Sequence, residues 1–388
     1  MTTLISFLGK GRADAQSGYR AASYKFDEGI IKTVNFFGLA LAEYLQPQRL
    51  ILVGTAGSMW DVFFEREGAD DETLALMDAV EGQRVDAAML ERHAKRLASE
   101  LGLVVDCLLI PYARDTAEQI AVLRGLASKV TENECVSIDV THSFRHLPML
   151  ALVAARYLAH VSKVKIEELY YGALEMTGAD GQTPVLRLSG LLKMLDWVEA
   201  LATYDKDGDY GVFAPLLVDD GMEPGRAKLL VKAAFFERTS NPVKAREALT
   251  TVFPSVEAHQ GELGGLFKGA LSKRINWFRK PTRQDWEASL ALASLERSDF
   301  LRAAQFMYES IATKAVYDTK GDCNNFDVRD EAMKAFRVGH KSLNKLTALR
   351  NAMSHGLRSK DQRDDSALKN REELARQLHR LADELLKP

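Results

Sequence analysis

The chain has 388 residues, of which 46% are hydrophobic and 27% charged, and its formal net charge at pH 7 is -3. This length exceeds that of one ordinary hydrophobic core and predicts about two domains. The nearly balanced charge excludes a strong overall field for a polyanion, so any contact with nucleic acid must come from a local basic patch.

The first half of the chain alternates short apolar segments with longer amphipathic ones. The short segments, rich in β-branched and aliphatic residues, predict strands at 3–9, 49–55, 103–111, 135–141 and 165–174. The amphipathic stretches predict helices at 36–45, 91–101, 116–130 and 147–160. Buried strands that alternate with helices are typical of a Rossmann-like parallel sheet. We therefore expect an α/β domain over residues 1–187.

Small, hydroxyl and basic residues collect in the loops after three of these strands. Ligands of open α/β sheets bind beyond the carboxyl ends of the strands, so these loops should line one pocket suited to phosphate. The loops match neither the Walker A nor the G-x-G-x-x-G pattern, which disfavours an ordinary ATPase or dinucleotide enzyme. The candidate binding residues are Gly9, Lys10, Gly11, Gly54, Thr55, Ser58, Trp60, Thr141, His142, Ser143 and Arg145.

The second half loses the strand pattern after about residue 188. Gly- and Asp-rich stretches indicate a linker or connecting helix over 188–212, and an all-α domain is expected over 213–388. Apolar periodicity predicts helices at 226–238, 242–253, 286–317, 330–353 and 366–386.

The segment LTALRNAMSHGLRS (346–359) carries Arg350, Asn351, Ser354 and His355 just before Gly356. These groups can bind phosphate or move protons, but a solvated helix end has a similar composition. Residues five apart on a helix differ by about 140°, so one straight helix cannot direct Arg350 and His355 at the same atom. Two copies that meet across a two-fold axis can do so, which predicts a homodimer with a composite site.

Two motifs resemble those of known families. SIDVTHSFRHLP resembles the D-x-T-H-G segment of CRISPR-associated Rossmann-fold (CARF) sensor domains, with Ser143 at the position of the motif glycine. Arg350-Asn351-x-x-x-His355 resembles the R-x4-6-H motif of HEPN ribonucleases. The order, sensor first and nuclease second, is that of the CARF–HEPN ribonucleases of type III CRISPR systems. Because Ser143 adds a side chain at the pocket floor, the exact ligand contacts stay open.

This resemblance implies a function in antiviral defence. A dimer of CARF domains would bind cyclic oligoadenylate as an allosteric activator, and the HEPN dimer would then cleave single-stranded RNA. Catalysis would use Arg350, Asn351 and His355, no metal and no cofactor, with attack of the ribose 2′-OH giving a 2′,3′-cyclic phosphate. Cyclic tetra-adenylate is the expected activator because an even ring suits a two-fold pocket, and the hexa-adenylate ring is equally even.

Two other functions remain compatible with the sequence. The helical half could only dimerise or recruit a partner, which would leave a sensor without nuclease activity. Alternatively, the protein could be a ring nuclease that cuts its own ligand in the CARF pocket.

Several residues have a plain structural interpretation beside the functional one. His142 and His146 stand four apart, which suits a metal, but contact with ribose or phosphate is favoured. Asp139 can anchor its loop, and Trp60 can stack on adenine or belong to the core. Basic and aromatic residues interleave over 267–286, which is typical of single-stranded RNA binding but also of solvated helix faces.

The remaining observations concern cysteine pairing and cellular location. Cys107, Cys135 and Cys323 are scattered and form no C-x-x-C pair, so neither a disulfide framework nor a zinc knuckle is indicated. The first residues lack the pattern of a signal peptide. No uninterrupted apolar run approaches the roughly 18–20 residues that span a bilayer. We expect a cytoplasmic protein with no membrane contact.

Overall fold

The computed structural model describes residues 1–10, 21–64, 70–142, 144, 146–356 and 367–386. The chain divides into two compact units, Met1–Leu192 and Lys193–Pro388, here named the α/β unit and the helical unit. The boundary falls inside helix α7 (Ser189–Asp207), where we expected the start of a linker. The first residues of α7 pack on the α/β core, whereas Trp197 and Tyr204 belong to the helical core.

The strands of the α/β unit are β1 Thr2–Phe7, β2 Ala22–Lys25, β3 Ile31–Val34, β4 Arg49–Gly54, β5 Val104–Leu109, β6 Cys135–Asp139, β7 Lys165–Gly172 and β8 Gln182–Arg187. Within the described residues they form one eight-stranded sheet in the order β3-β2-β8-β7-β6-β1-β4-β5. The five predicted strands are confirmed as the parallel part, β7-β6-β1-β4-β5.

The whole sheet is mixed, because three strands that the sequence did not predict extend the parallel part. β8 runs antiparallel to β7, β2 pairs parallel with β8, and β3 runs antiparallel to β2. These three strands lie toward one edge, and they are short and polar, with Pro184 inside β8. Edge strands do not need the continuous apolar run that marks a strand buried on both faces.

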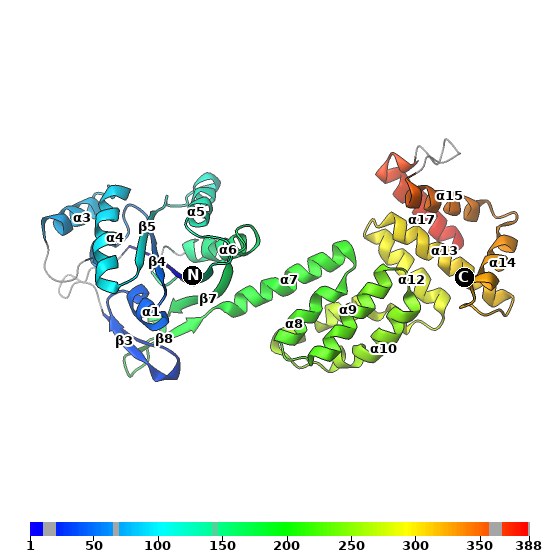
Figure 1. Ribbon diagram of the computed structural model, residues 1–388, viewed down its shortest axis with the longest axis horizontal. Coiled ribbons are helices and arrows are strands. Elements are labelled where there is room, and N and C mark those ends of the chain that lie inside the picture. Colours follow the sequence, from blue (N-terminus) through cyan, green and yellow to red (C-terminus); the bar gives the residue numbers. More distant parts are fainter. Residues whose placement is uncertain (11–20, 65–69, 143, 145, 357–366, 387–388) are drawn as a thin grey trace. The chain divides into compact units, whose positions relative to one another are not determined.

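Two helical layers cover the parallel strands. The helices of this unit are α1 Phe37–Leu45, α2 Trp60–Phe64, α3 Asp71–Glu81, α4 Ala87–Leu101, α5 Thr116–Ser128 and α6 His146–His160, with 3-10 turns η1 Asp27–Gly29 and η2 Leu174–Met176. Leu50 and Leu52 of β4 face α1, α3 and α4, whereas Ile51 and Val53 face α5 and α6. This alternation gives the α/β sandwich of Figure 1.

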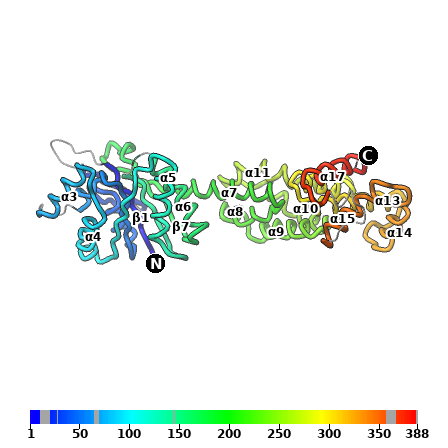
Figure 2. The backbone as a smooth tube through the Cα atoms, turned by 90° about the horizontal axis from the view of Figure 1, so that it is seen from above, coloured from blue at the N-terminus to red at the C-terminus, as the bar shows by residue number. Residues whose placement is uncertain are grey.

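The helical unit contains α7, η3 Tyr210–Val212, α8 Phe213–Asp219, α9 Pro224–Arg238, α10 Pro242–Ala258, α11 Glu262–Ile275, η4 Asn276–Arg279, α12 Arg283–Glu296, α13 Phe300–Asp318, α14 Phe326–Arg337, α15 Lys341–His355 and α17 Arg371–Leu385. The expected linker is therefore helical over most of its length. Figure 2 shows α13, α14, α15 and α17 gathered at one end of this unit.

Two predicted helices of this unit are each divided in two. The segment 286–317 breaks between α12 and α13 at Ser298, where φ is 61°. The segment 330–353 breaks before α15 at Gly339, where φ is 84°. A left-handed residue ends a helix even where the apolar period continues through it. Among the described residues, no helix is long and apolar enough to cross a membrane.

Candidate functional site

The end of β6 is tied into the fold by the carboxylate of Asp139. Its Oδ2 accepts a hydrogen bond from Ser6 Oγ of β1 at 2.6 Å, and its Oδ1 accepts one from Thr141 N at 2.8 Å. Burial raises the pKa of Asp139 to about 6, although the bonds from Ser6 and Thr141 oppose that rise. The side chain lies in the interior, so the anchoring interpretation fits and a ligand contact does not.

Thr141 and His142 extend the same internal network to two further elements. Thr141 Oγ1 accepts a bond from Gly172 N at the end of β7, at 2.8 Å. His142 Nε2 accepts a bond from Phe37 N, the first amide of α1, at 3.2 Å, and its ring stacks on Phe36 with centroids 4.8 Å apart. Burial lowers the pKa of His142 to about 4, so the ring is neutral and acts as an acceptor.

The D-x-T-H residues therefore join β6 to β1, β7 and α1. We call the hydrogen bonds made by Asp139, Thr141 and His142 the β6 anchor. The expected contact of His142 with the ligand does not fit this structure, because its ring is buried and its Nε2 caps α1. A shared metal with His146 does not fit either, since His146 Nε2 lies 2.9 Å from the carbonyl oxygen of Tyr112.

The loop after β4 folds back on itself and packs inward. Ser58 Oγ accepts a bond from Thr55 N at 2.9 Å and donates one to the Leu8 carbonyl at 2.9 Å. Trp60 is fully buried, and its Nε1 donates to the Thr55 carbonyl at 2.8 Å. The expectation that Trp60 stacks on adenine is wrong, because core side chains cover its ring.

Gly54 makes this turn possible. A Cβ atom there would lie 2.8 Å from the Trp60 ring and 2.9 Å from Ser58 Cβ. Gly54, Thr55 and Ser58 therefore shape the loop, and the buried hydroxyls of Thr55 and Ser58 bond each other at 3.2 Å. Side-chain contact between these three residues and a ligand is not supported.

A pocket of about 770 Å³ does open beyond these strand ends, and exposed Lys10 lines it as predicted. Gly9 lies in the interior, and its carbonyl accepts a bond from Met59 N at 2.9 Å. Two aromatic residues missed by sequence reasoning, Tyr112 after β5 and Phe144 after β6, also line this pocket, with ring centroids 5.9 Å apart. An aromatic residue in the loop that follows a parallel strand was the available signal.

The other lining residues of this pocket mix polar and apolar groups. Tyr112 is held from the side by Gln83, whose Oε1 accepts from the tyrosine hydroxyl at 3.0 Å. The remaining lining residues are Gly57, Met59, Asp61, Met77, Asp78, Val80 and Glu81. Three expected binding residues, Gly11, Ser143 and Arg145, lie outside the described residues.

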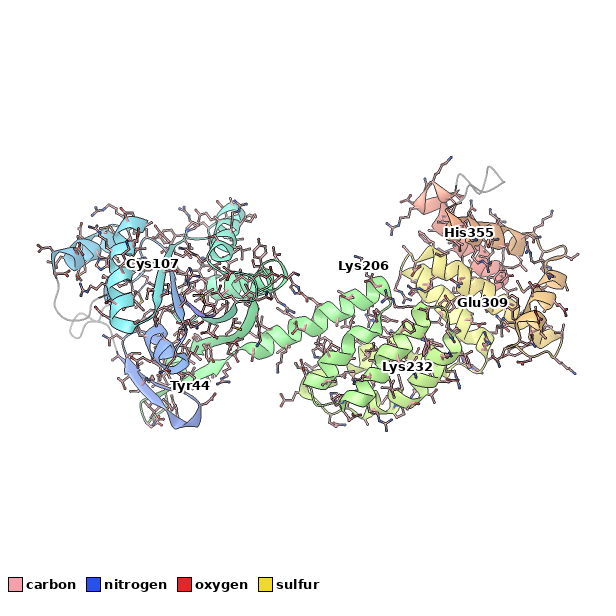
Figure 3. The ribbon with its side chains drawn as sticks, in the orientation of Figure 1. Tyr44, Cys107, Lys206, Lys232, Glu309 and His355 are labelled. Carbon is pink, nitrogen blue, oxygen red and sulfur yellow. The ribbon has the colours of Figure 1, made fainter. Side chains whose placement is uncertain are left out.

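The second motif lies at the end of α15 in the helical unit, where Figure 3 labels His355. The Arg350 guanidinium lies over the Tyr308 ring of α13, 4.2 Å from its centroid. Its Nη2 also donates to Asn351 Oδ1 at 3.0 Å. Asn351 and His355 are exposed, and Gly356 ends the helix with φ 62°. The polar groups of this motif thus face solvent instead of the core.

The basic and aromatic stretch at 267–286 is partly tied into the helical core. Trp277 and Phe278 are buried, and Trp277 Nε1 donates to buried Glu237 at 2.9 Å. Arg274 and Arg279 pair with carboxylates at 2.7 Å each. Trp277 and Phe278 therefore serve the core, whereas Phe267 and Trp286 are only partly buried.

Comparisons with known proteins agree with the geometry of the first unit. Residues 3–175 match the family model described as the CARF domain of the CRISPR system endoribonuclease Csx1. The chain is also similar to CRISPR-associated protein MJ1674 of Methanocaldococcus jannaschii, with 26% identity over 282 residues. That alignment covers 66% of this chain and 44% of the relative, so the chain spans less than half of that protein's length.

The family model ends before α7 and covers none of the helical unit. The resemblance predicted from the D-x-T-H segment is thereby confirmed for the first unit alone. Its α/β unit is similar to the CARF domain of a CRISPR-associated endoribonuclease.

Proposed function

We propose that this protein is a cyclic-oligoadenylate-activated, metal-independent ribonuclease that acts on single-stranded RNA in type III CRISPR defence. The observation that carries the proposal is the solvent-facing cluster at the end of α15. Arg350 is oriented there by Tyr308 and Asn351, and His355 is exposed five residues later. The similarity of the α/β unit to a CARF domain supports the regulatory part of the proposal, activation by cyclic oligoadenylate.

The chemistry uses the ribose of the RNA itself. The 2′-oxygen loses its proton and forms a bond to the adjacent phosphorus, and the bond from phosphorus to the 5′-oxygen breaks. The 5′-oxygen then takes up a proton, so the products carry a 2′,3′-cyclic phosphate and a 5′-hydroxyl. Imidazole groups transfer protons near neutral pH, which fits His355 for these steps. The planar cation of Arg350 offers paired donors to the phosphate as its negative charge grows.

The activator pocket is the one lined by Lys10, Tyr112 and Phe144. Lys10 would contact a phosphate of the ring, and the two aromatic side chains would stack on adenine. Two copies of the chain would enclose one ring, with cyclic tetra-adenylate favoured and the hexa-adenylate next. Ligand binding shifts the dimer only by its differential affinity for the active arrangement.

The experiment that tests this function is cleavage of end-labelled single-stranded RNA in EDTA, with and without cyclic oligoadenylates of each ring size. We expect one ring to raise the cleavage rate, and a substrate with 2′-deoxyribose at the scissile position to stay intact. Ring binding without any RNA cleavage would favour a pure sensor. Loss of the ring itself, with RNA unchanged, would favour a ring nuclease.

A further inference from the structure

A basic cleft of about 880 Å³ lies beside the end of α15, and the nuclease motif does not account for it. Its walls come from the ends of α7 and α9, the turn between α12 and α13, the end of α15, and the segment that leads into α17. The lining has a formal surplus of three positive charges, because two carboxylates accompany five cations. The charged lining residues are Lys206, Arg238, Arg297, Arg302, Lys369, Asp207 and Asp299.

Among the described residues, two of these cations have no carboxylate within ion-pair distance. Arg238 pairs with Asp209 at 2.5 Å, and Arg302 pairs with Asp299 at 3.1 Å. By contrast, Lys206 and Arg297 form no ion pair with any of the residues that the structure describes. Lys206 is exposed at the end of α7, where Figure 3 labels it. The positive potential of the cleft is therefore available to an anion from outside.

Arg297 is held in place by its surroundings. Its guanidinium lies 5.6 Å from the centroid of the Tyr204 ring. Gly208, with φ 73°, gives it room, because a Cβ atom there would lie 2.9 Å from Arg297 Nη2. Burial raises the pKa of nearby Glu237 to about 7, although the charge of Arg297 opposes that rise. At neutral pH this buried acid is therefore partly protonated and compensates Arg297 incompletely.

The cleft borders the end of α15, although Arg350, Asn351 and His355 themselves are not among its lining residues. Ala352, Met353 and Gly356 line it, and they belong to the same final turn as His355. The α13 residues Phe300 and Leu301 add apolar surface next to the cations. Cations next to apolar side chains suit a single nucleic-acid strand, because its phosphates bind the cations and its bases pack on the apolar surface. A purely structural role, neutralising helix carboxyl ends, would need neither the volume nor the proximity to His355.

We propose that this cleft binds the phosphate backbone of the RNA strand next to the scissile phosphate, with Lys206 and Arg297 as the principal contacts. The inference rests on the proposed nuclease function and adds the path of its substrate. Each phosphate contact displaces condensed counterions from the RNA, so affinity must fall as salt rises. The cleft thus supplies affinity, and the residues at the end of α15 supply chemistry.

The test is binding of a fluorescent 2′-O-methyl RNA, which lacks the attacking hydroxyl, to the full-length protein across a salt series. Lys206→Ala should weaken binding by about three- to tenfold at low salt and reduce the salt slope by about 0.7. Lys206→Arg should restore both values because it keeps the charge. The matched control is Lys232→Ala, an exposed lysine of α9 that does not line the cleft, labelled in Figure 3.

Equal affinity and equal salt slope for Lys206→Ala and Lys232→Ala would overturn the inference, even if the wild type cleaves RNA. The proposed nuclease is judged separately, by cleavage of unmodified RNA with the same preparations. Binding that depends on Lys206 without any cleavage would overturn the nuclease and leave the cleft as an RNA site.

Discussion

The two polar motifs of this chain look alike in sequence but lie in opposite environments. In the α/β unit, Asp139, Thr141 and His142 direct their hydrogen bonds inward, to β1, β7 and α1. In the helical unit, Asn351 and His355 are exposed. A buried polar group must find partners within the fold, whereas an exposed one stays available for a substrate. The first motif therefore supports the fold around a pocket, whereas the second leaves its polar groups exposed, as the proposed RNA cleavage requires.

The largest expected effect concerns the exposed motif. His355→Ala should reduce RNA cleavage by about 10²–10⁴-fold, the usual contribution of a positioned proton-transfer group. Unfolding and activator binding should not change, because His355 makes no core contact. The control is His379→Ala, an exposed histidine of α17. Cleavage by His355→Ala at the wild-type rate would remove this residue from the mechanism.

The next effect concerns Asp139, whose folded-state pKa of about 6 lies above its ordinary value of 3.8. The folded protein therefore holds this proton more tightly than the unfolded chain. The stabilisation that comes from this tighter proton binding is fully present below about pH 4 and is lost as the pH rises to about 6. Asp139→Asn cannot titrate, so its free energy of unfolding relative to wild type should rise by up to about 3 kcal/mol over that range. A pH-independent difference in denaturant titrations would contradict this.

A smaller loss is expected for Thr141→Val, which keeps the shape but removes the acceptor of the buried Gly172 amide. An unsatisfied buried donor costs about 1–3 kcal/mol of unfolding free energy. Thr33→Val on exposed β3 is the matched control and should cost less than half as much. Equal losses of unfolding free energy in the two variants, measured by chemical denaturation, would show that the β6 anchor stabilises the fold no more than an exposed strand residue does.

Lys10→Ala should have the smallest effect, a loss of about tenfold in affinity for cyclic oligoadenylate, because one exposed charge-assisted contact is removed. Stability should be unchanged. Lys25→Ala, an exposed residue at the end of β2, serves as the control in calorimetry. Wild-type affinity for Lys10→Ala would place the activator elsewhere.

The periodic parts of the fold could be predicted from sequence, and the long-range contacts could not. Strands buried on both faces have continuous apolar runs, so the five parallel strands were found. The outer strands β8, β2 and β3 have no such run, and the break at Ser298 depends on a backbone angle that periodicity does not show.

The long-range contacts of the candidate site were equally hidden from the sequence. The sequence singled out the loop after β6, but the direction of its side chains depends on partners 133 and 105 residues away, Ser6 and Phe37. The basic cleft was missed because five separate segments supply its lining. Trp60 was misassigned for a related reason, since a tryptophan in a loop looks the same whether it faces ligand or core.

The most direct test measures RNA cleavage and activator binding on the same preparations of His355→Ala and Lys10→Ala. If sensing and chemistry reside in different units, His355→Ala binds cyclic oligoadenylate normally and does not cleave RNA. Lys10→Ala binds the ring weakly but reaches the wild-type maximal cleavage rate once the ring is in excess. Loss of both properties to the same extent in either variant would contradict this division between the two units.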